Sequence, residues 1–222
     1  MADRRPAAQQ PDSFAWTDDS KAIAETWIAK YPEGRQASAV IPLLWQAQKQ
    51  EGWVSIPAME AIAAQLSMPY IRVYEVATFY TMFNLKPEGT YFVQLCGTTP
   101  CMLRGAEDLA AVCEKVIGPQ GTLTDSGHLS WLEVECLGAC CNAPMVQIND
   151  YYYQDLTAEK FEEILVKLDR GEYVEPGVFN AGRHTSDPEG DNTSLTDASL
   201  YDGSAAQPIA KLPNSDPAPA AG

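Results

Sequence analysis

The chain has 222 residues, of which 45% are hydrophobic, and it carries a formal net charge of −15 at pH 7. This length fits one ordinary domain or two small ones, and the hydrophobic share is enough to build a core. The charge argues against nucleic acid and anionic lipid as partners, because both would repel the chain. No segment has the apolar length of a membrane span and the N-terminus lacks the apolar stretch of a secretory signal, so we expect a cytoplasmic protein with no direct membrane insertion.

The first half of the chain has the pattern of several short helices. Apolar residues recur at helical spacing in four stretches, which lie within residues 21–31, 37–51, 55–66 and 67–83. Ser55 and Ser67 are placed to cap the third and fourth helices, and Phe79 and Tyr80 fall on the apolar face of the fourth. Short helices joined by short turns predict a small helical bundle over residues 18–88.

The pattern changes after Gly89 to one that mixes strands with helices. Expected strands lie at residues 91–95, 129–134, 145–148 and 151–153, and expected helices lie at residues 102–117 and 158–168. The last two strands flank Asn149-Asp150, which is typical of a hairpin turn. This order predicts a small α/β sandwich over residues 89–170.

Both ends of the chain lack this periodicity. Residues 1–17 are polar and predict a flexible N-terminus. Residues 171–222 contain six prolines, few large apolar side chains, and eight acidic against two basic residues, a net charge of −6. Such a segment cannot bury enough surface to offset its ordering entropy, so we expect an extended or disordered acidic tail.

Four of the six cysteines form two close pairs, Cys96 with Cys101 and Cys136 with Cys140, and each pair follows an expected strand. Loops at the carboxyl ends of strands are where α/β folds usually build sites. Between the paired cysteines stand mainly small residues, which allow backbone N–H groups to approach a thiolate or a sulfide. Spacing alone leaves an iron–sulfur cluster and a structural zinc ion both open, with a disulfide less favoured.

The histidines and the remaining cysteines narrow the choice of metal centre and of its ligands. A Rieske centre is excluded because neither His128 nor His184 is paired with a cysteine in a tight loop, and the Cys-X-X-Cys motif of dithiol chemistry is absent. Cys113 falls on an apolar helix face, which predicts packing. Cys141 adjoins a candidate ligand, and a structural role is expected because adjacent side chains rarely point at one metal.

Three stretches of the sequence resemble one known family. Residues 96–101 with the following Met-Leu-Arg-Gly, and residues 133–140 with the following Ala143-Pro144, resemble the two ligand loops of thioredoxin-like [2Fe–2S] ferredoxins. The run at residues 72–83 resembles the helix that precedes this domain in the same family. Over about residues 18–170 the chain is similar to the NuoE-type, or 24-kDa, subunits of respiratory complex I.

The resemblance implies a thioredoxin-like fold for residues 89–170 and one [2Fe–2S] cluster. It implies that Cys96 and Cys101 bind one iron, and that Cys136 and Cys140 bind the other. It also implies an electron carrier within a proton-translocating NADH:quinone oxidoreductase, with no catalytic residues of its own.

The implied partners are an NADH- and FMN-binding flavoprotein subunit, which would supply the electron, and the other peripheral-arm subunits of complex I. The assembly would lie on the cytoplasmic side of the bacterial inner membrane. One alternative is the equivalent diaphorase-type subunit of an NAD-linked hydrogenase or formate dehydrogenase. A more distant alternative is a structural zinc-binding interaction module.

Overall fold

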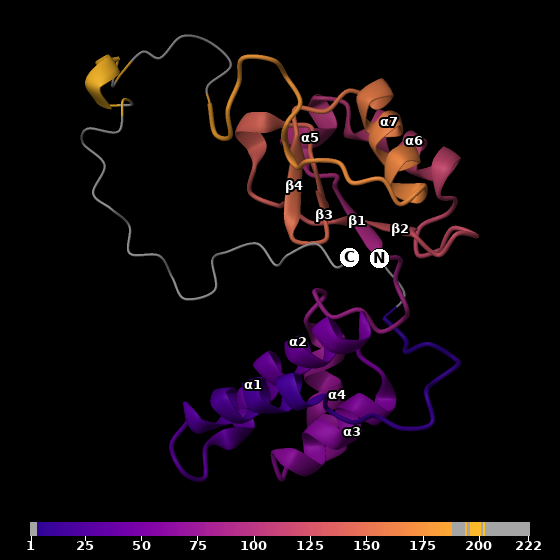
Figure 1. Cartoon of the computed structure of the whole chain (residues 1–222), viewed down its shortest axis with the longest axis vertical. Coiled ribbons are helices and arrows are strands. Elements are labelled where there is room, and N and C mark those ends of the chain that lie inside the picture. The colour runs from indigo at the N-terminus through magenta and orange to yellow at the C-terminus, as the bar shows by residue number, and fades with distance from the viewer. Residues whose placement is uncertain (1–3, 188–193, 195, 201, 203–222) are drawn as a thin grey trace. The chain divides into compact units, whose positions relative to one another are not determined.

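The computed structural model describes residues 4–187, 194, 196–200 and 202 (Figure 1). The chain divides between Ser186 and Asp187 into two units. In the second unit the described residues form one short element, the 3-10 helix η3 (Ala198–Leu200), where Ser199 donates to the Asp197 carboxylate. All other elements belong to the first unit.

The first half of this unit is helical, as expected. Its elements are α1 (Asp18–Ala29), the 3-10 helix η1 (Gln36–Ala39), α2 (Val40–Glu51), α3 (Ile56–Gln65) and α4 (Tyr70–Phe79). The Thr17 and Ser55 side chains each accept from a backbone N–H one turn later, so they cap α1 and α3. Gly52, with φ of 81°, ends α2 in the left-handed conformation that glycine adopts without strain.

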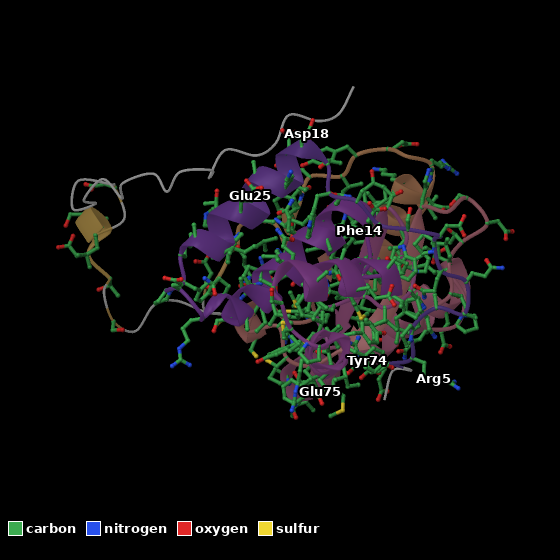
Figure 2. The ribbon with its side chains drawn as sticks, turned by 90° about the horizontal axis from the view of Figure 1, so that it is seen from below. Arg5, Phe14, Asp18, Glu25, Tyr74 and Glu75 are labelled. Carbon is green, nitrogen blue, oxygen red and sulfur yellow. The ribbon has the colours of Figure 1, made fainter. Side chains whose placement is uncertain are left out.

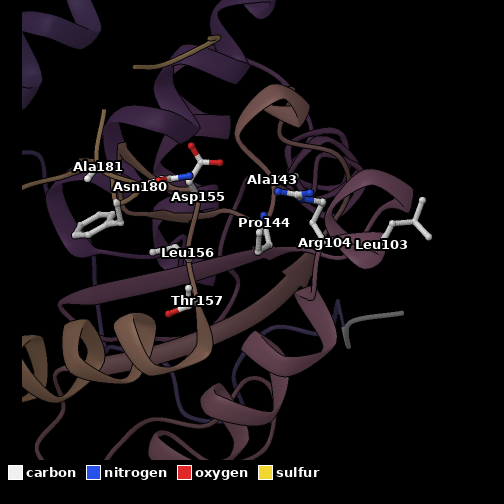
Figure 3. A pocket seen from close by; sticks show the side chains of 10 residues that line it. Leu103, Arg104, Ala143, Pro144, Asp155, Leu156, Thr157, Asn180 and Ala181 are labelled. Carbon is white, nitrogen blue, oxygen red and sulfur yellow. The ribbon is translucent and has the colours of Figure 1, made fainter. Parts of the chain in front are cut away.

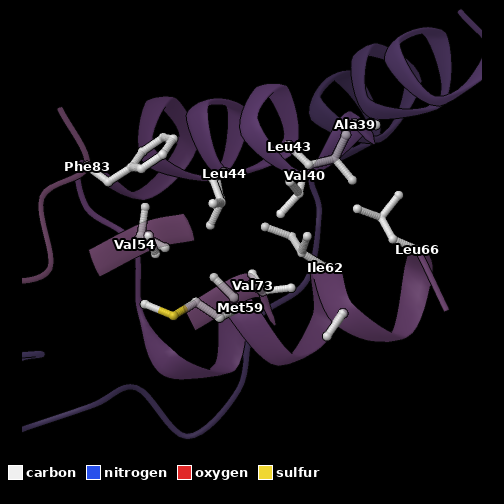
Figure 4. Packing of buried hydrophobic residues seen from close by; sticks show 14 of the residues in the cluster. Ala39, Val40, Leu43, Leu44, Val54, Met59, Ile62, Leu66, Val73 and Phe83 are labelled. Atoms are coloured by element: carbon white, nitrogen blue, oxygen red, sulfur yellow. The ribbon is translucent and has the colours of Figure 1, made fainter. Parts of the chain in front are cut away.

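The helices share one hydrophobic core. Leu43 and Leu44 of α2 face Met59 and Ile62 of α3, and all four side chains are fully buried (Figure 4). In contrast to these core residues, Asp18 and Glu25 of α1 are exposed and project into solvent (Figure 2). Each buried aliphatic side chain contributes about 1.5–3 kcal/mol of transfer free energy, so this core stabilises the helical half.

The end of this helical region differs from the prediction. The helix α4 begins after Pro69, because Ser67 has φ of 51° and no capping hydrogen bond, so the predicted Ser67 cap is wrong. The helix also stops at Phe79 rather than running to residue 83. Phe79 is 76% exposed and Tyr80 39% exposed, so their predicted burial is wrong. Helical spacing predicts which side chains are buried only for residues that belong to the helix.

Arg4 explains how α4 ends. Its guanidinium donates hydrogen bonds of 2.7–3.3 Å to the carbonyls of Ala77, Thr78, Tyr80 and Phe83. These carbonyls lie at the helix C-terminus, where backbone acceptors lack partners and a positive charge is favoured. Phe14 and Trp16 also pack against the helical core. The described residues from Arg4 to Trp16 therefore make specific contacts with the helical half.

The second half of the unit contains a five-stranded sheet. Its strands are β1 (Tyr91–Cys96), β2 (Leu129–Val134), β3 (Val146–Ile148), β4 (Tyr151–Gln154) and β5 (Gly177–Val178), in the order β2-β1-β3-β4-β5. The β1–β2 and β4–β5 pairs are parallel, and β3 is antiparallel to both neighbours. The predicted hairpin is confirmed, with Asn149 at φ of 53° in its turn.

Helices cover this sheet and complete its core. The helices α6 (Ala106–Val116) and α7 (Ala158–Asp169) pack against each other, α6 also contacts β1, and α7 also contacts β2 (Figure 1). Trp131 of β2 and Phe161 of α7 are almost completely buried between them. The single helix predicted at residues 102–117 is instead two, because Gly105 with φ of 103° separates α5 (Thr99–Leu103) from α6.

The first part of the predicted tail is ordered. β5 pairs with β4, and the Phe179 ring stacks on Tyr153 with centroids 5.9 Å apart. The expectation that order ends at Gly171 is therefore wrong for this segment, since β4 offers an edge that β5 can pair with. The expectation for residues 188–193, 195, 201 and 203–222 lies outside the described residues. None of the described helices is long and apolar enough to span a membrane.

An Arg4→Ala substitution tests the role of Arg4 at the end of α4. We expect it to lower the free energy of unfolding by about 1–2 kcal/mol, because several carbonyls lose a charged donor. Urea denaturation followed by circular dichroism measures the change. Arg35→Ala, which removes an exposed side chain, is the control. Equal stability of the two variants would contradict this account.

Candidate metal centre

The two cysteine pairs lie at the same edge of the sheet. β1 and β2 are parallel and in register, with Cys96 opposite Val134 at their carboxyl ends. Cys136 follows two residues after β2, so both loops leave the sheet at one place. We call residues 96–101 the first cysteine loop and residues 136–144 the second cysteine loop.

The first cysteine loop holds its two sulfurs inside the protein. Cys96, the last residue of β1, is 2% exposed, and Cys101, in the short helix α5, is 1% exposed. The Thr98 hydroxyl lies 3.4 Å from the Cys96 sulfur. The Cys96 and Cys101 thiols lie close enough to shift each other's pKa, and the Met145 backbone acts to lower the pKa of Cys101. This pair is therefore preformed by core elements.

The surroundings of these two thiols shift their pKa values in opposite directions. Burial on its own raises the pKa of Cys96, but hydrogen bonds from the Thr98 side chain and from the Leu137 and Thr98 backbones outweigh it, so the pKa is lowered. Burial, followed by the nearby Cys96 sulfur, raises the pKa of Cys101 to about 12. The site thus favours a thiolate on Cys96, which is the form that binds metal.

The second cysteine loop presents its sulfurs at the surface. Cys136 and Cys140 are both exposed, and Gly138 between them has φ of 78°. The Gly138 N–H lies 3.4 Å from the Cys136 sulfur and donates to it. The hydrogen bond between the paired side chains raises the pKa of Cys140. A left-handed glycine and a backbone donor to sulfur suit a loop that wraps around an anionic centre.

The two loops contact each other. The Leu137 backbone N–H of the second loop donates to the Cys96 sulfur of the first, and Cys140 is close enough to Cys96 for their charges to interact. Ala139 and Leu137 pack on the apolar cluster that contains Cys96 and Cys101. Among the described residues, no three His, Cys, Asp or Glu side chains gather to hold a single metal ion. The four thiols instead associate two by two.

This arrangement fits the chemistry of a [2Fe–2S] cluster. Such a cluster takes two thiolates on each of two irons. The structure supplies two pairs of neighbouring thiols on two loops, with the Thr98 hydroxyl and the Gly138 N–H beside cysteine sulfur. Donors of this kind stabilise negative charge on a cluster and influence its potential.

The other cysteines and His128 lie outside this arrangement. Cys113 is fully buried in α6, where burial raises its pKa to about 12, and its predicted packing role is confirmed. Cys141 is exposed next to Cys140. His128 has its Nδ1 atom 2.7 Å from the Asp169 carbonyl oxygen at the end of α7.

Of the three consecutive tyrosines, one is exposed and two are packed. Tyr151 is 52% exposed, whereas Tyr153 is 5% exposed. The Tyr152 hydroxyl donates to the Leu137 carbonyl at 2.6 Å, so this side chain supports the second cysteine loop. The role of Tyr152 was not predicted, because nothing in the sequence pairs β4 with that loop.

Three polar residues beside the second cysteine loop were also missed. Asn142, Asp155 and Arg183 form one hydrogen-bonded group, which we call the Arg183 network. A pocket of about 540 Å³ opens beside it, with Arg104 and Asp155 on its walls and Pro144 between them (Figure 3). An asparagine that interrupts the apolar run after Cys141 is the one signal that could have indicated a buried polar contact.

The fold and the paired thiols together define a thioredoxin-like iron–sulfur domain preceded by helices. The model of the thioredoxin-like [2Fe–2S] ferredoxin family matches residues 24–169, and the chain belongs to this family. This membership confirms the resemblance noted in the sequence, the fold class and the expectation of one [2Fe–2S] cluster.

Two curated relatives, both E-type subunits of NADH-quinone oxidoreductase, are similar over most of the chain. The relative from Rhizobium meliloti (strain 1021) is 54% identical over 190 residues, which cover 84% of this chain and 69% of the relative. The relative from Rickettsia bellii (strain RML369-C) is 51% identical over 158 residues, which cover 70% of this chain and 95% of the relative.

A solved structure shares the fold at lower identity. The NAD+-reducing [NiFe]-hydrogenase in its H2-reduced state superposes with a TM-score of 0.53 and 20% identity. The match covers 59% of this chain and 22% of the hydrogenase chain.

A Cys113→Ala substitution tests whether Cys113 packs in the core or binds iron. We expect it to lower the free energy of unfolding by about 1 kcal/mol through a small cavity, and to leave iron and acid-labile sulfide per chain unchanged. Denaturant titration and chemical analysis of the purified protein measure the two quantities. Loss of iron from a protein that remains folded would contradict the packing role.

Proposed function

We propose that this chain is the electron-transfer subunit of an NADH:quinone oxidoreductase, and that its cluster is held by Cys96 and Cys101 on one iron and by Cys136 and Cys140 on the other. The observation that carries the ligand assignment is the parallel pairing of β1 with β2, which brings the two cysteine loops to the same edge of the sheet. The similarity to two E-type subunits at above 50% identity supports the complex.

The bound cluster supplies a centre that takes up and releases one electron at a time, at a potential on the order of −400 mV or somewhat higher for four thiolate ligands. The chain controls this centre through its surroundings. The Thr98 hydroxyl and the Leu137 and Gly138 N–H groups are directed at cysteine sulfur, and the first pair is buried. Hydrogen bonds to sulfur stabilise the negative charge of the cluster, whereas burial destabilises it. The balance of the two therefore sets how readily the cluster is reduced.

The electron donor is proposed to be reduced FMN on an NADH-binding flavoprotein subunit. The sequence contains no G-x-G-x-x-G loop for a dinucleotide. The surface of the cluster loops suits a protein partner, since Leu103 is 75% exposed and Met102 45% exposed directly after Cys101, and Cys136 and Cys140 are exposed on the second loop. In this proposal the other peripheral-arm subunits hold the assembly on the cytoplasmic side of the bacterial inner membrane.

The alternatives are less well supported. Similarity to the NAD+-reducing hydrogenase is only 20% in identity and concerns the fold alone. Membership of a [2Fe–2S] ferredoxin family disfavours the zinc-binding module.

A Cys136→Ala substitution tests the ligand assignment, with Cys141→Ala as its matched control. The purified wild-type chain should contain about two irons and two acid-labile sulfides, and should give a [2Fe–2S] EPR signal after dithionite reduction. Cys141→Ala should keep this signal, because its thiol belongs to neither pair. Cys136→Ala should lose or strongly alter it, because one iron loses a thiolate. An unaltered spectrum in Cys136→Ala would overturn the assignment.

A further inference from the structure

The second cysteine loop is fastened by a buried ion pair from farther along the chain. The Arg183 guanidinium donates to one Asp155 carboxylate oxygen at 2.6 Å, and the other carboxylate oxygen accepts from the Asn142 amide at 2.8 Å. The Asp155 side chain is 4% exposed and the Arg183 side chain 13% exposed. The same guanidinium donates at 2.8 Å to the Cys141 carbonyl. One arginine therefore connects Asp155, which directly follows β4, with its own segment and the second cysteine loop.

Backbone contacts complete this attachment. The Asp155 N–H donates to the Asn142 carbonyl at 2.8 Å, and the Asn142 amide donates to the His184 carbonyl at 3.1 Å. The Ser186 N–H in turn donates to the Asn142 side-chain oxygen at 2.7 Å. The 3-10 helix η2 (Cys140–Asn142) starts at the candidate ligand Cys140, and the network holds its two following residues.

The two cysteine loops differ in what holds them. Cys96 and Cys101 are buried on core elements, whereas Cys136 and Cys140 are exposed on a loop. Breaking a buried charge pair leaves an uncompensated charge, so the Arg183 network is costly to rearrange. It gives the exposed loop a rigid support that the loop does not provide for itself.

We infer that Arg183 is a positioning residue that acts through Asp155 and Asn142 to hold Cys140 in place for the iron of the second cysteine pair. The inference rests on the ligand assignment under the proposed function. It extends the cluster-binding unit beyond α7 to the segment that contains β5 and Arg183. Groups that orient metal ligands in this way typically change metal affinity 10- to 100-fold when removed.

The test compares full-length Arg183→Ala and Arg183→Lys with the control Arg170→Ala, which removes an exposed arginine at the end of α7. The measurements are the rate of cluster loss to an iron chelator, the g values of the reduced cluster and the melting temperature. Arg183→Ala should lose its cluster roughly tenfold faster or more and show shifted or broadened g values. Arg183→Lys, which can keep the charge beside Asp155 but lacks the forked donor, should fall between it and the wild type.

Three outcomes would overturn the inference. In the first, the wild type holds a normal cluster and Arg183→Ala retains its cluster as firmly as Arg170→Ala, with identical g values; only the positioning role then fails. In the second, faster loss with unchanged g values is fully explained by a lower melting temperature, which would reduce Arg183 to a structural residue. In the third, the wild-type chain holds no [2Fe–2S] cluster, which would overturn the proposed function and this inference together.

Discussion

The parallel, in-register pairing of β1 with β2 is the constraint on which the site depends. This pairing puts Cys96 opposite Val134, so that Cys96 and Cys136 lie at the same edge of the sheet. Side chains alternate between the two faces of a strand. A slip of one residue in the register of this pairing would therefore turn the side chains of the shifted strand to the opposite face. The buried side chains of Trp131 and Leu129 on β2 oppose such a slip, since it would remove them from the hydrophobic core that they form with α6 and α7. The hydrophobic core therefore fixes the geometry of the metal centre.

The two halves of the centre are built differently. The first thiol pair is part of the core and is surrounded by hydrogen-bond donors, which lower the pKa of Cys96. The second pair lies on a surface loop, whose shape depends on Tyr152 and on the Arg183 network. A buried half protects the centre from solvent, and an exposed half leaves it accessible to a redox partner. The segment after α7, which looks like a linker by composition, contributes to the centre through Arg183.

The sequence was informative at most positions where neighbouring residues decide the structure, with the Ser67 cap and the break at Gly105 as exceptions. The cap at Ser55, the hairpin turn at Asn149 and the strand before each cysteine pair could all be predicted, because each depends on neighbouring residues. It was uninformative where distant residues decide. Arg4 contacts carbonyls more than 70 positions away, and Arg183 reaches Asp155 across 28 positions. The spacing of the cysteines predicted a metal site, but the choice between iron and zinc needed the family similarity.

Iron X-ray absorption on the purified chain tests the central claim most directly, because it reports which atoms surround each metal and whether a second metal lies beside it. The account predicts iron with sulfur in every coordination position and a distinct iron–iron scattering contribution, as expected for two sulfide-bridged irons with cysteine ligands. A protein that contains zinc in place of iron, or iron sites with no metal neighbour, would contradict it.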